Sequence, residues 1–516
     1  MTATLLVDGT DNGPDLTSVT MGRLLAAAPH ILGDAPNDAL LARGGGVLFE
    51  TLTRSVKAQR RDDLVWLLIV AVTGAFPNAE HVRSARRAIW LAEPVVAHLA
   101  LLQTLYSLGA HYRNLDAEIE IVTDGVVVDV DFCANHTANT GIQRVVRQTM
   151  SRWDADRDIV PVAWTPHGGA MRRLSPLERS RVVEWNKYTE PLVKPDASIP
   201  ANRIVVPFGS AVILPEVPQP HLCDPLAALA EFSGNRVGLI GYDAIPIVSA
   251  DNVPAEETER FVHYLTIIKH SKRVVGISAA STEDFRGFSD TLASQGLAPV
   301  VTMEVSLPVD VPDLDSMPPA PHSASPLILC VGSQEPRKNQ DAVLFASEVL
   351  WREGLDFRVR FIGGGSLWFT RGFDQRVKAL QKRGRSVEVW RGVKDSALLG
   401  SYAEAEFSIF PSLHEGYGLP VAESIAMGVP VVTTAYASTG EIAADGGCLL
   451  VDPRDDQSIV NAMRRLLTEA GLGDELRRQI AARPRRTWDD YARELWDGLV
   501  APLIDTPELT TGADCG

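Results

Sequence analysis

Two carboxylates and a glycine-broken loop stand together in residues 414–423, His-Glu-Gly-Tyr-Gly-Leu-Pro-Val-Ala-Glu. The two glycines allow positive φ and a close approach of the backbone to a ligand, and Pro420 suits the first turn of a helix. Free amides at a helix start favour an anion such as a phosphate. Glu423 would lie about one turn inside that helix and Glu415 in the loop before it, where each can accept hydrogen bonds from vicinal hydroxyls. The segment therefore predicts a sugar-nucleotide site.

A basic pair follows a predicted strand further upstream. Residues 327–331 form an apolar run, and Gly332 ends it, as expected for a buried strand and a turn. Arg337 and Lys338 come a few residues later and could neutralise a diphosphate. Such a pair alone is more often part of a solvated turn. Its combination with a second anion-binding segment makes the functional interpretation the stronger one.

Together these segments resemble the retaining glycosyltransferases of family 4, the glycosyl transferases group 1, and residues Glu415 and Glu423 match the EX7E signature of that family. A strand ending in glycines at 361–365 and a strand at 387–393 before a predicted helix over 395–405 follow the family order. The resemblance covers most of residues 327–500. Many relatives carry an arginine where this chain has Ser333, and we expect the neighbouring basic pair to supply that charge.

The resemblance implies a role for each matching residue. Lys338 and Arg337 would neutralise the donor diphosphate, Glu423 would bind the nucleotide ribose, and Glu415 would bind hydroxyls of the donor sugar. Lys338, Glu415 and Asp243 are the candidate catalytic residues. Further donor-binding positions are Gly141, Val393, Gly416, Tyr417, Gly418 and Leu419. The family transfers sugar from the front face with retention, and the leaving phosphate takes the acceptor proton.

The same resemblance implies an α/β architecture of the GT-B type, with two Rossmann-like domains facing a cleft, preceded here by a helical extension. Ala, Leu and Arg at helical spacing mark the extension, and prolines mark a linker between the domains. The expected divisions are a helical extension at 1–118, an N-terminal acceptor domain at 119–306, a linker at 307–326, a C-terminal nucleotide-sugar domain at 327–486, a helix crossing back to the N-terminal domain at 487–503, and a tail at 504–516.

Polar groups follow predicted strands of the N-terminal domain. The strand at 236–242 runs into Asp243, in a segment that resembles the His-Asp-x-x-Pro loop of the family with Tyr242 in place of histidine. Ligands bind beyond the carboxyl ends of strands in an open α/β sheet. We therefore expect the acceptor near Gly141, His136 and Asp243, while a purely structural cap at Asp243 is an equal alternative.

An Asp-x-Asp sequence occurs at Asp129 and Asp131, within a predicted buried strand at 126–131 that precedes a polar loop at 132–140. Metal-dependent glycosyltransferases use this motif in a loop, whereas here it falls in a first strand. GT-B enzymes hold the diphosphate with amides and basic side chains. We expect neither a metal nor a cofactor, with the nucleotide-diphosphate sugar as donor substrate.

Composition narrows the class of protein. A chain of 516 residues predicts two or three domains. The formal net charge of -16 argues against a general nucleic-acid binder. The five cysteines show no metal spacing, which is typical of reduced thiols in a cytoplasmic protein. The start of the chain lacks the basic region of a signal peptide, and the apolar run at 64–76 is too short to span a membrane.

Residues 83–96 bear on peripheral contact with the inner face of a membrane. Arginines within 83–87 precede an apolar stretch at 89–96, which could form a basic amphipathic helix on a lipid surface. A helix packed on its own domain, with Trp90 in the core, is the favoured interpretation because Glu93 and Pro94 interrupt the apolar face.

The predicted function is transfer of a hexose or deoxyhexose from a nucleotide-diphosphate sugar to a glycan, lipid-linked or other acceptor in cell-surface polysaccharide synthesis. A nucleotide-sugar epimerase with the same fold is one alternative, and it would isomerise the donor alone. A non-catalytic binding protein is another, kept open by Ser333 and Tyr242. A nicotinamide dehydrogenase is disfavoured, because no Gly-x-Gly-x-x-Gly follows a first strand.

Overall fold

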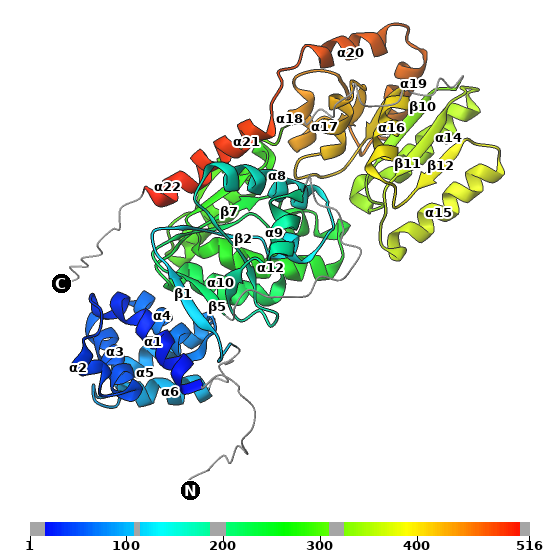
Figure 1. Ribbon diagram of the computed structural model, residues 1–516. Coiled ribbons are helices and arrows are strands. Elements are labelled where there is room, and N and C mark those ends of the chain that lie inside the picture. The colour runs from blue at the N-terminus through cyan, green and yellow to red at the C-terminus, as the bar shows by residue number, and fades with distance from the viewer. Residues whose placement is uncertain (1–15, 108–113, 186–202, 309–324, 506–516) are drawn as a thin grey trace, which may run out of the picture.

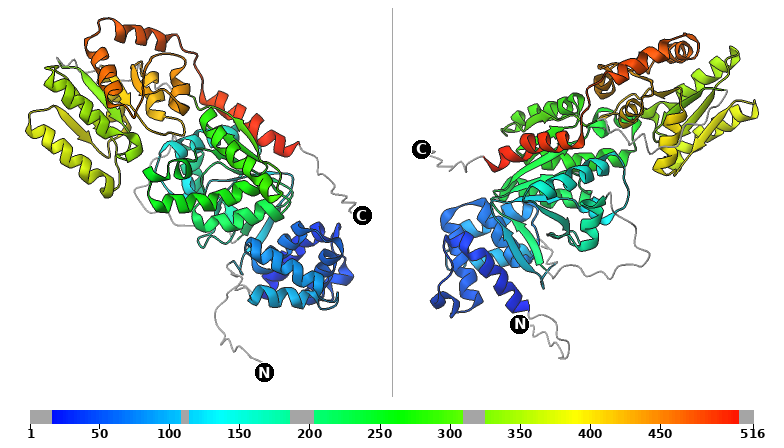
Figure 2. Two further views of the ribbon diagram at one scale, coloured as in Figure 1. Left: turned by 180° about the vertical axis from the view of Figure 1, so that it is seen from behind. Right: turned by 45° about the horizontal axis from the view of Figure 1, so that its top comes forward.

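The computed structural model describes residues 16–107, 114–185, 203–308 and 325–505. Figure 1 shows a helical extension, two α/β domains in a row, and a C-terminal segment that returns to the first of these domains. The extension lies against the N-terminal domain, on the side away from the C-terminal domain, and the views in Figure 2 agree. The GT-B arrangement predicted from the motifs is therefore present.

The extension is a bundle of helices, and one of them, α4, is buried along almost its whole length. Arg23 lies inside this bundle, and its guanidinium donates to the carbonyls of Ala71, Leu115 and Ala117 at 2.9, 2.7 and 3.0 Å. These bonds satisfy the buried charge and join the bundle to the start of the first strand. The helices are α1 (Leu16–Leu32), α2 (Asp38–Leu41), α3 (Gly45–Gln59), α4 (Asp62–Thr73), α5 (Ala79–Leu91) and α6 (Ala97–Ser107).

The N-terminal domain is built on a sheet in the order β1-β5-β4-β3-β2-β6-β7-β8-β9. All pairs are parallel except those of β4, and the buried β-branched runs suit a sheet covered on both faces. The strands are β1 (Glu118–Val122), β2 (Val126–Asp129), β3 (Val160–Trp164), β4 (Met171–Arg173), β5 (Arg203–Pro207), β6 (Ala211–Leu214), β7 (Arg236–Gly241), β8 (Arg273–Gly276) and β9 (Val301–Glu304).

The helices of this domain follow its strand ends. They are α7 (Asp131–Asn135), α8 (Gly141–Asp156), α9 (Pro176–Val182), α10 (Pro220–Phe232), α11 (Ile245–Val248), α12 (Ala255–His270) and α13 (Ala279–Thr291). The prediction of a strand through Asp131 and a loop from 132 is wrong in part. Strand β2 ends at Asp129, and Asp131 opens α7, because its side chain accepts from a backbone N–H of β3 and bends the chain there.

The C-terminal domain has a parallel sheet in the order β12-β11-β10-β13-β14-β15. This is the doubly wound Rossmann order, whose switch point lies between the first and fourth strands of the sheet. The strands are β10 (Leu327–Val331), β11 (Arg358–Ile362), β12 (Val387–Trp390), β13 (Phe407–Phe410), β14 (Val431–Thr434) and β15 (Cys448–Val451). The helices are α14 (Gln340–Arg352), α15 (Leu367–Lys382), α16 (Asp395–Glu404), α17 (Leu419–Ala426), α18 (Ala437–Ala443), α19 (Asp456–Thr468) and α20 (Leu472–Ala481).

The last helices lie on the N-terminal domain. They are α21 (Trp488–Leu495), the π-helical turn η6 (Trp496–Val500) and α22 (Ala501–Ile504). The indole of Trp153 on α8 donates to the Ala492 carbonyl at 2.9 Å, and Arg273 on β8 donates to the Gly498 carbonyl at 2.5 Å. The chain therefore connects the two domains twice, because it leaves the N-terminal domain and then returns to it. Most of the predicted linker lies outside the described residues.

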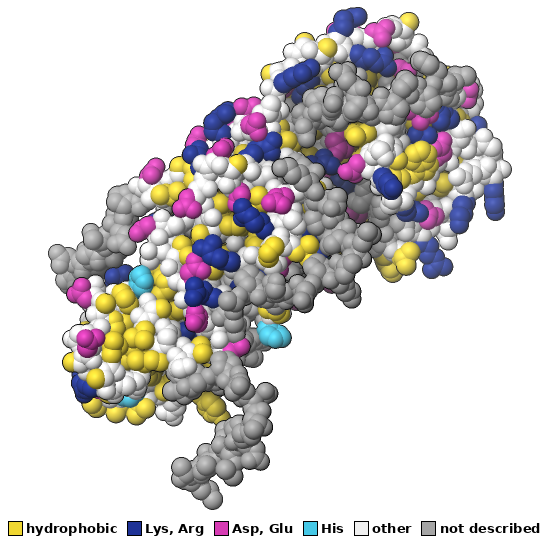
Figure 3. Space-filling model, viewed as in Figure 1, with side chains coloured by type: hydrophobic (Ala, Val, Ile, Leu, Met, Phe, Trp, Pro, Cys, Tyr) yellow, Lys and Arg dark blue, Asp and Glu magenta, His cyan; other side chains and the backbone are white. Residues whose placement is uncertain are grey.

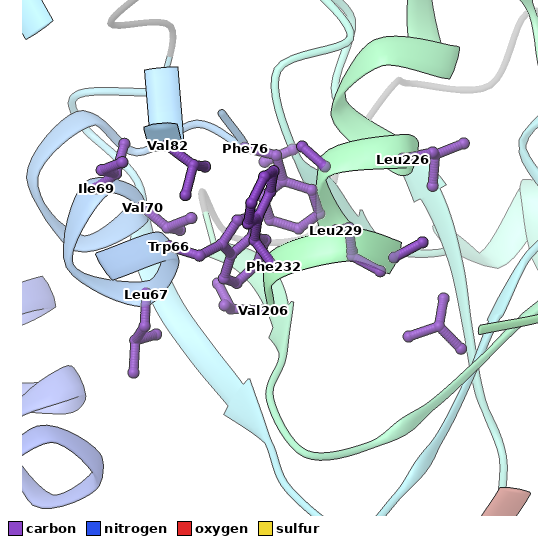
Figure 4. Close-up of a cluster of buried hydrophobic side chains, with 14 of the residues drawn as sticks. Trp66, Leu67, Ile69, Val70, Phe76, Val82, Val206, Leu226, Leu229 and Phe232 are labelled. Atoms are coloured by element: carbon purple, nitrogen blue, oxygen red, sulfur yellow. The ribbon is translucent and has the colours of Figure 1, made fainter. Parts of the chain in front are cut away.

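The extension and the N-terminal domain share one hydrophobic core (Figure 4). Trp66 and Phe76 lie with ring centroids 5.2 Å apart, and Phe76 meets Trp164 of β3 at 5.7 Å. Leu229 and Phe232 of α10 lie on the other side of this cluster in Figure 4. The extension is therefore packed against the N-terminal domain through a shared core rather than joined to it only by the chain.

Helix α5 packs on its own domain, as favoured from the sequence, but Trp90 is half-buried against the core rather than within it. Ile89 is buried, Arg83 forms an ion pair with Glu231 of α10 at 2.8 Å, and Arg86 pairs with Asp62 at 2.7 Å. Hydrophobic side chains nevertheless gather on the extension in Figure 3. Exposed apolar residues of this region are Leu91, Val95, Val96, Leu99, Leu102 and Tyr106. Within the described ranges, no helix combines the length and the apolar character needed to cross a membrane.

Trp66 offers a test of the shared core. Its side chain is fully buried, and its indole N–H has no partner among the described residues. We expect Trp66→Ala to lower the free energy of unfolding by about 3–5 kcal/mol, whereas Trp66→Phe should cost less than about 1.5 kcal/mol, because it keeps most of the volume and removes the unpaired N–H. Urea denaturation followed by circular dichroism would measure both. Trp368→Phe, at an exposed tryptophan, is the control, and equal losses for the two Trp66 variants would contradict the prediction.

Candidate active site

Glu415 is held between two cations at the switch point of the C-terminal sheet. Lys338 Nζ lies 2.5 Å from Glu415 Oε1, and Arg337 Nη1 lies 3.0 Å from Glu415 Oε2. The cations belong to a 3-10 turn (Pro336–Lys338) after β10, and Glu415 lies in the loop after β13, the neighbouring strand. The structure thus brings together the two segments that the sequence singled out, in the crevice where open α/β sheets bind ligands.

This cluster is shielded from water. Lys338 and Glu415 are each 9% exposed, and the ammonium also lies 5.0 Å from the centre of the Phe410 ring. Burial by itself would raise the pKa of Glu415, but Lys338 and Arg337 together hold that pKa below its usual value. Burial lowers the pKa of Lys338, and Glu415 only partly offsets this. An anion entering here would meet two cations with little competition from solvent.

The loop after Glu415 has the predicted helix start. Gly418 adopts φ 106° and caps α17, whose first turn contains Pro420. The Gly416 carbonyl accepts from Ser278 and Ser281 of the N-terminal domain, at 2.7 and 2.9 Å.

Position 416 needs a glycine because of this domain contact. A Cβ there would lie 2.4 Å from the Tyr242 carbonyl oxygen. Tyr417 directs its hydroxyl to the Leu307 carbonyl at 2.7 Å, so its side chain has a structural role.

Glu423 lies in the middle of the same helix and is half-buried. Arg144 of the N-terminal domain donates to its Oε1 at 2.8 Å, and the Tyr402 hydroxyl donates to its Oε2 at 3.1 Å. Val393 follows β12 and packs its side chain against the small cluster that contains Tyr402. Glu423 and Val393, both predicted to bind the donor, therefore lie in one region. Arg144 belongs to the same region, although the sequence did not single it out.

Asp243 and Gly141 are predicted site residues of the N-terminal domain that the structure places against the C-terminal domain. Asp243 Oδ1 accepts from the Ile245 N–H at 3.1 Å and so holds the turn that leads into α11, which is a structural role of the kind left open from the sequence. Burial raises the pKa of Asp243, although the positive charge of Arg337 acts in the opposite direction. Gly141 opens α8, and a Cβ on it would lie 2.8 Å from Leu419 Cδ1. Asp243 therefore holds the turn before α11 and also lies near Arg337.

His136 lies in a loop shaped by Arg147, a residue missed from the sequence. The buried guanidinium donates to the carbonyls of His136 and Ala138 at 2.8 and 2.6 Å. The His136 ring packs on Phe132, with centroids 4.4 Å apart. The available signal was an arginine on the apolar face of α8, between valines at 145 and 146 and a methionine at 150. A charge there requires a set of buried carbonyls as partners.

The carboxylates of Asp129 and Asp131 accept hydrogen bonds from Trp164. Asp129 Oδ2 accepts from the Trp164 indole at 2.9 Å, and Asp131 Oδ1 accepts from the Trp164 backbone N–H at 2.8 Å. Glu216 lies beside them and accepts from the N–H groups at 132 and 133. Burial raises the pKa of Glu216 to about 7. These carboxylates organise α7, and among the described residues no trio of His, Cys, Asp or Glu is arranged to hold a metal ion.

Residues 325–469 match the family described as glycosyl transferases group 1. The serotype-specific mannosyltransferase WbdA of Escherichia coli is 25% identical over 63% of this chain and 39% of its own length. A GDP-mannose-dependent alpha-(1-6)-phosphatidylinositol dimannoside mannosyltransferase of Mycobacterium tuberculosis is 29% identical over 77% of this chain and 92% of its own. Sucrose-phosphate synthase of Thermosynechococcus elongatus matches in structure with a TM-score of 0.48 and 16% identity, over 72% of this chain and 97% of that chain.

These findings bear on the resemblance drawn from the motifs. The family match coincides with the C-terminal domain that carries Lys338, Glu415 and Glu423. Together with the mannosyltransferase relatives, it confirms the resemblance to glycosyl transferases group 1 and supports a GT-B glycosyltransferase. The chain spans about two fifths of the length of the WbdA relatives that it matches.

The contact at Gly416 predicts the effect of adding one methyl group. In Gly416→Ala the new Cβ would meet a backbone oxygen of the other domain at 2.4 Å, which cannot rotate away, so the domains must separate. We expect a larger radius of gyration in small-angle X-ray scattering. Gly400→Ala on α16, where a Cβ has no neighbour within 4 Å, should leave the radius unchanged and add up to about 1 kcal/mol of helix stability. An unchanged radius for Gly416→Ala would show that the contact yields locally.

Proposed function

We propose that this chain is a retaining, family 4-like glycosyltransferase that moves a hexose or deoxyhexose from a nucleotide-diphosphate sugar to a glycan, lipid-linked or other acceptor in cell-surface polysaccharide synthesis. The buried cluster of Lys338, Glu415 and Arg337 carries this proposal, because it lies at the switch point of the domain that matches the family. The names of the relatives make mannose the first sugar to test.

Donor binding would redistribute the charges of this cluster. The diphosphate takes Lys338 and Arg337 as partners, together with the free amides at the start of α17. Glu415 then turns its oxygens to hydroxyls of the donor sugar, while Glu423 accepts from the ribose. Cations that face a carboxylate in the free protein therefore face the developing charge of the leaving nucleotide, which is stabilisation aimed at the transition state.

The transfer step needs no enzymic nucleophile in this proposal. The bond between the anomeric carbon and the diphosphate oxygen breaks, and the acceptor oxygen bonds to the same face of that carbon. The acceptor proton passes to the leaving phosphate oxygen. Asp243 lies on the acceptor side of the cleft and would orient the acceptor or the sugar. Two buried cations and the loop amides supply the positive potential, so we propose a reaction without a metal or a cofactor.

The first experiment screens nucleotide sugars, beginning with GDP-mannose and UDP-glucose, by thermal shift. A donor at a hundred times its dissociation constant should add about 2.7 kcal/mol of stability. Lys338→Ala should weaken binding by more than the roughly 1 kcal/mol of an exposed ion pair and abolish transfer. Lys378→Ala, an exposed lysine on α15, is the control. If Lys338→Ala binds the donor and transfers sugar as well as the parent, the assignment of the diphosphate site is refuted.

Two further arms of that experiment separate the alternatives. Donor incubated without acceptor should remain unchanged, because an isomerised sugar would identify an epimerase. Binding without transfer to any glycan or lipid-linked acceptor would favour a non-catalytic binding protein. Transfer should persist in excess chelator, and a loss that Mg²⁺ or Mn²⁺ restores would return Asp129 and Asp131 to consideration as metal ligands.

The two glutamates should respond differently to amide substitution. Glu423→Gln loses charge-assisted bonds to the ribose, so donor affinity should fall more than turnover. Glu415→Gln changes the contact with the transferred sugar, where charge develops as the glycosidic bond breaks, so the rate at saturating donor should fall more than the affinity. Steady-state kinetics with one donor would measure both parameters. Identical profiles for the two variants would contradict the division of roles.

A further inference from the structure

Arg144 stands in an electrostatically unfavourable position on its own helix. It lies in the first turn of α8, where the helix dipole presents positive charge and disfavours a cation. The compensating anion comes from the other domain, since Arg144 Nη1 lies 2.8 Å from Glu423 Oε1. The side chains are 30% and 21% exposed, so the pair is partly shielded from solvent.

The same contact fixes the orientation of Glu423. One of its oxygens accepts from Arg144 of the N-terminal domain, and the other accepts from the buried hydroxyl of Tyr402 at 3.1 Å. Each oxygen keeps a further lone pair for a ligand. The carboxylate assigned to the ribose is therefore ready to bind only while the two domains are in contact.

A cavity of about 190 Å³ lies beside this pair. Helices from both domains and the returning C-terminal segment line it, through Arg144, Asp395, Leu398, Leu419, Glu423 and Trp488. The starts of α8 and α17 meet here, because a Cβ on Gly141 would lie 2.8 Å from Leu419 Cδ1. Two helix N-termini and a guanidinium thus meet at one cavity, whose lining also carries the carboxylates of Asp395 and Glu423.

We propose that Arg144 is a donor-binding residue contributed by the N-terminal domain. A guanidinium has five N–H donors, and among the described residues Arg144 makes one hydrogen bond, to Glu423. That bond orients Glu423 for the ribose, and the remaining donors serve the nucleotide diphosphate at the start of α17, where Leu419 lines the same cavity. Nucleotide binding consequently stabilises the contact between the domains. This inference rests on the proposed function, because it takes Glu423 as the ribose ligand.

The test compares Arg144→Ala and Arg144→Lys with the parent by isothermal titration calorimetry, using GDP, UDP and the corresponding monophosphates as probes. Loss of a charge-assisted contact should weaken diphosphate binding about tenfold or more in Arg144→Ala, with less effect on the monophosphate. Arg144→Lys should recover part of the diphosphate affinity. Arg152→Ala removes an arginine of the same helix that pairs with Asp489 at 2.5 Å, and it should stay within about twofold of the parent.

Two readouts distinguish donor binding from a purely structural ion pair. The effect of Arg144→Ala on affinity should shrink in a Glu423→Gln background, since the two residues act through one contact. Nucleotide should reduce the radius of gyration of the parent but not that of Arg144→Ala.

A lower melting temperature with unchanged affinity would overturn the inference. If Lys338→Ala still weakens binding in that case, the proposed function stands without Arg144. If the parent binds none of the four nucleotides, the proposed function fails and this inference fails with it.

Discussion

The burial of Glu415 between Lys338 and Arg337 is the interaction on which the rest of the site depends. Ions removed from water persist only when partners surround them, and here each oxygen of the carboxylate meets one cation. The pairing joins the loops after β10 and β13, so it fixes the backbone that leads into Gly416 and α17. A ligand that competes for the cations would have to displace Glu415 from both of them.

The contact between the domains follows from that fixed loop. The Gly416 carbonyl accepts from Ser278 and Ser281, and Glu441 of α18 accepts from the amides of Ala279 and Ala280 at 2.9 and 2.8 Å. A carboxylate at the N-terminus of α13 is favoured by the helix dipole. These bonds lie at the end of β8, near the point where the C-terminal helices return to the sheet. The domains therefore meet through these directional polar bonds and through a shared hydrophobic cluster to which Tyr242 contributes from one domain and Tyr417 and Val421 from the other.

The extension joins the N-terminal domain through apolar packing. Trp66 and Phe76 place it in one apolar core with Trp164 and Phe232, so it moves with the N-terminal domain. Trp164 also donates to Asp129 at the end of β2. Packing in the extension is thus continuous with the strand ends of the N-terminal domain, and a change in the extension can reach them through side chains in contact.

Local patterns in the sequence determined the strands and helix starts of the C-terminal domain that carry the candidate site. Apolar runs ending in glycine predicted β10 and β11, and Pro420 predicted the start of α17, because strand burial and helix capping act over a few residues. Long-range contacts were decided only by the tertiary structure. Arg144 and Glu423 are 279 positions apart, and no local pattern states that they meet. The requirement for glycine at position 416 likewise comes from a carbonyl of the other domain. Neighbouring residues in the sequence predict the helix or strand that they form together. Which residues pair across the cleft depends instead on how the two folded domains pack against each other.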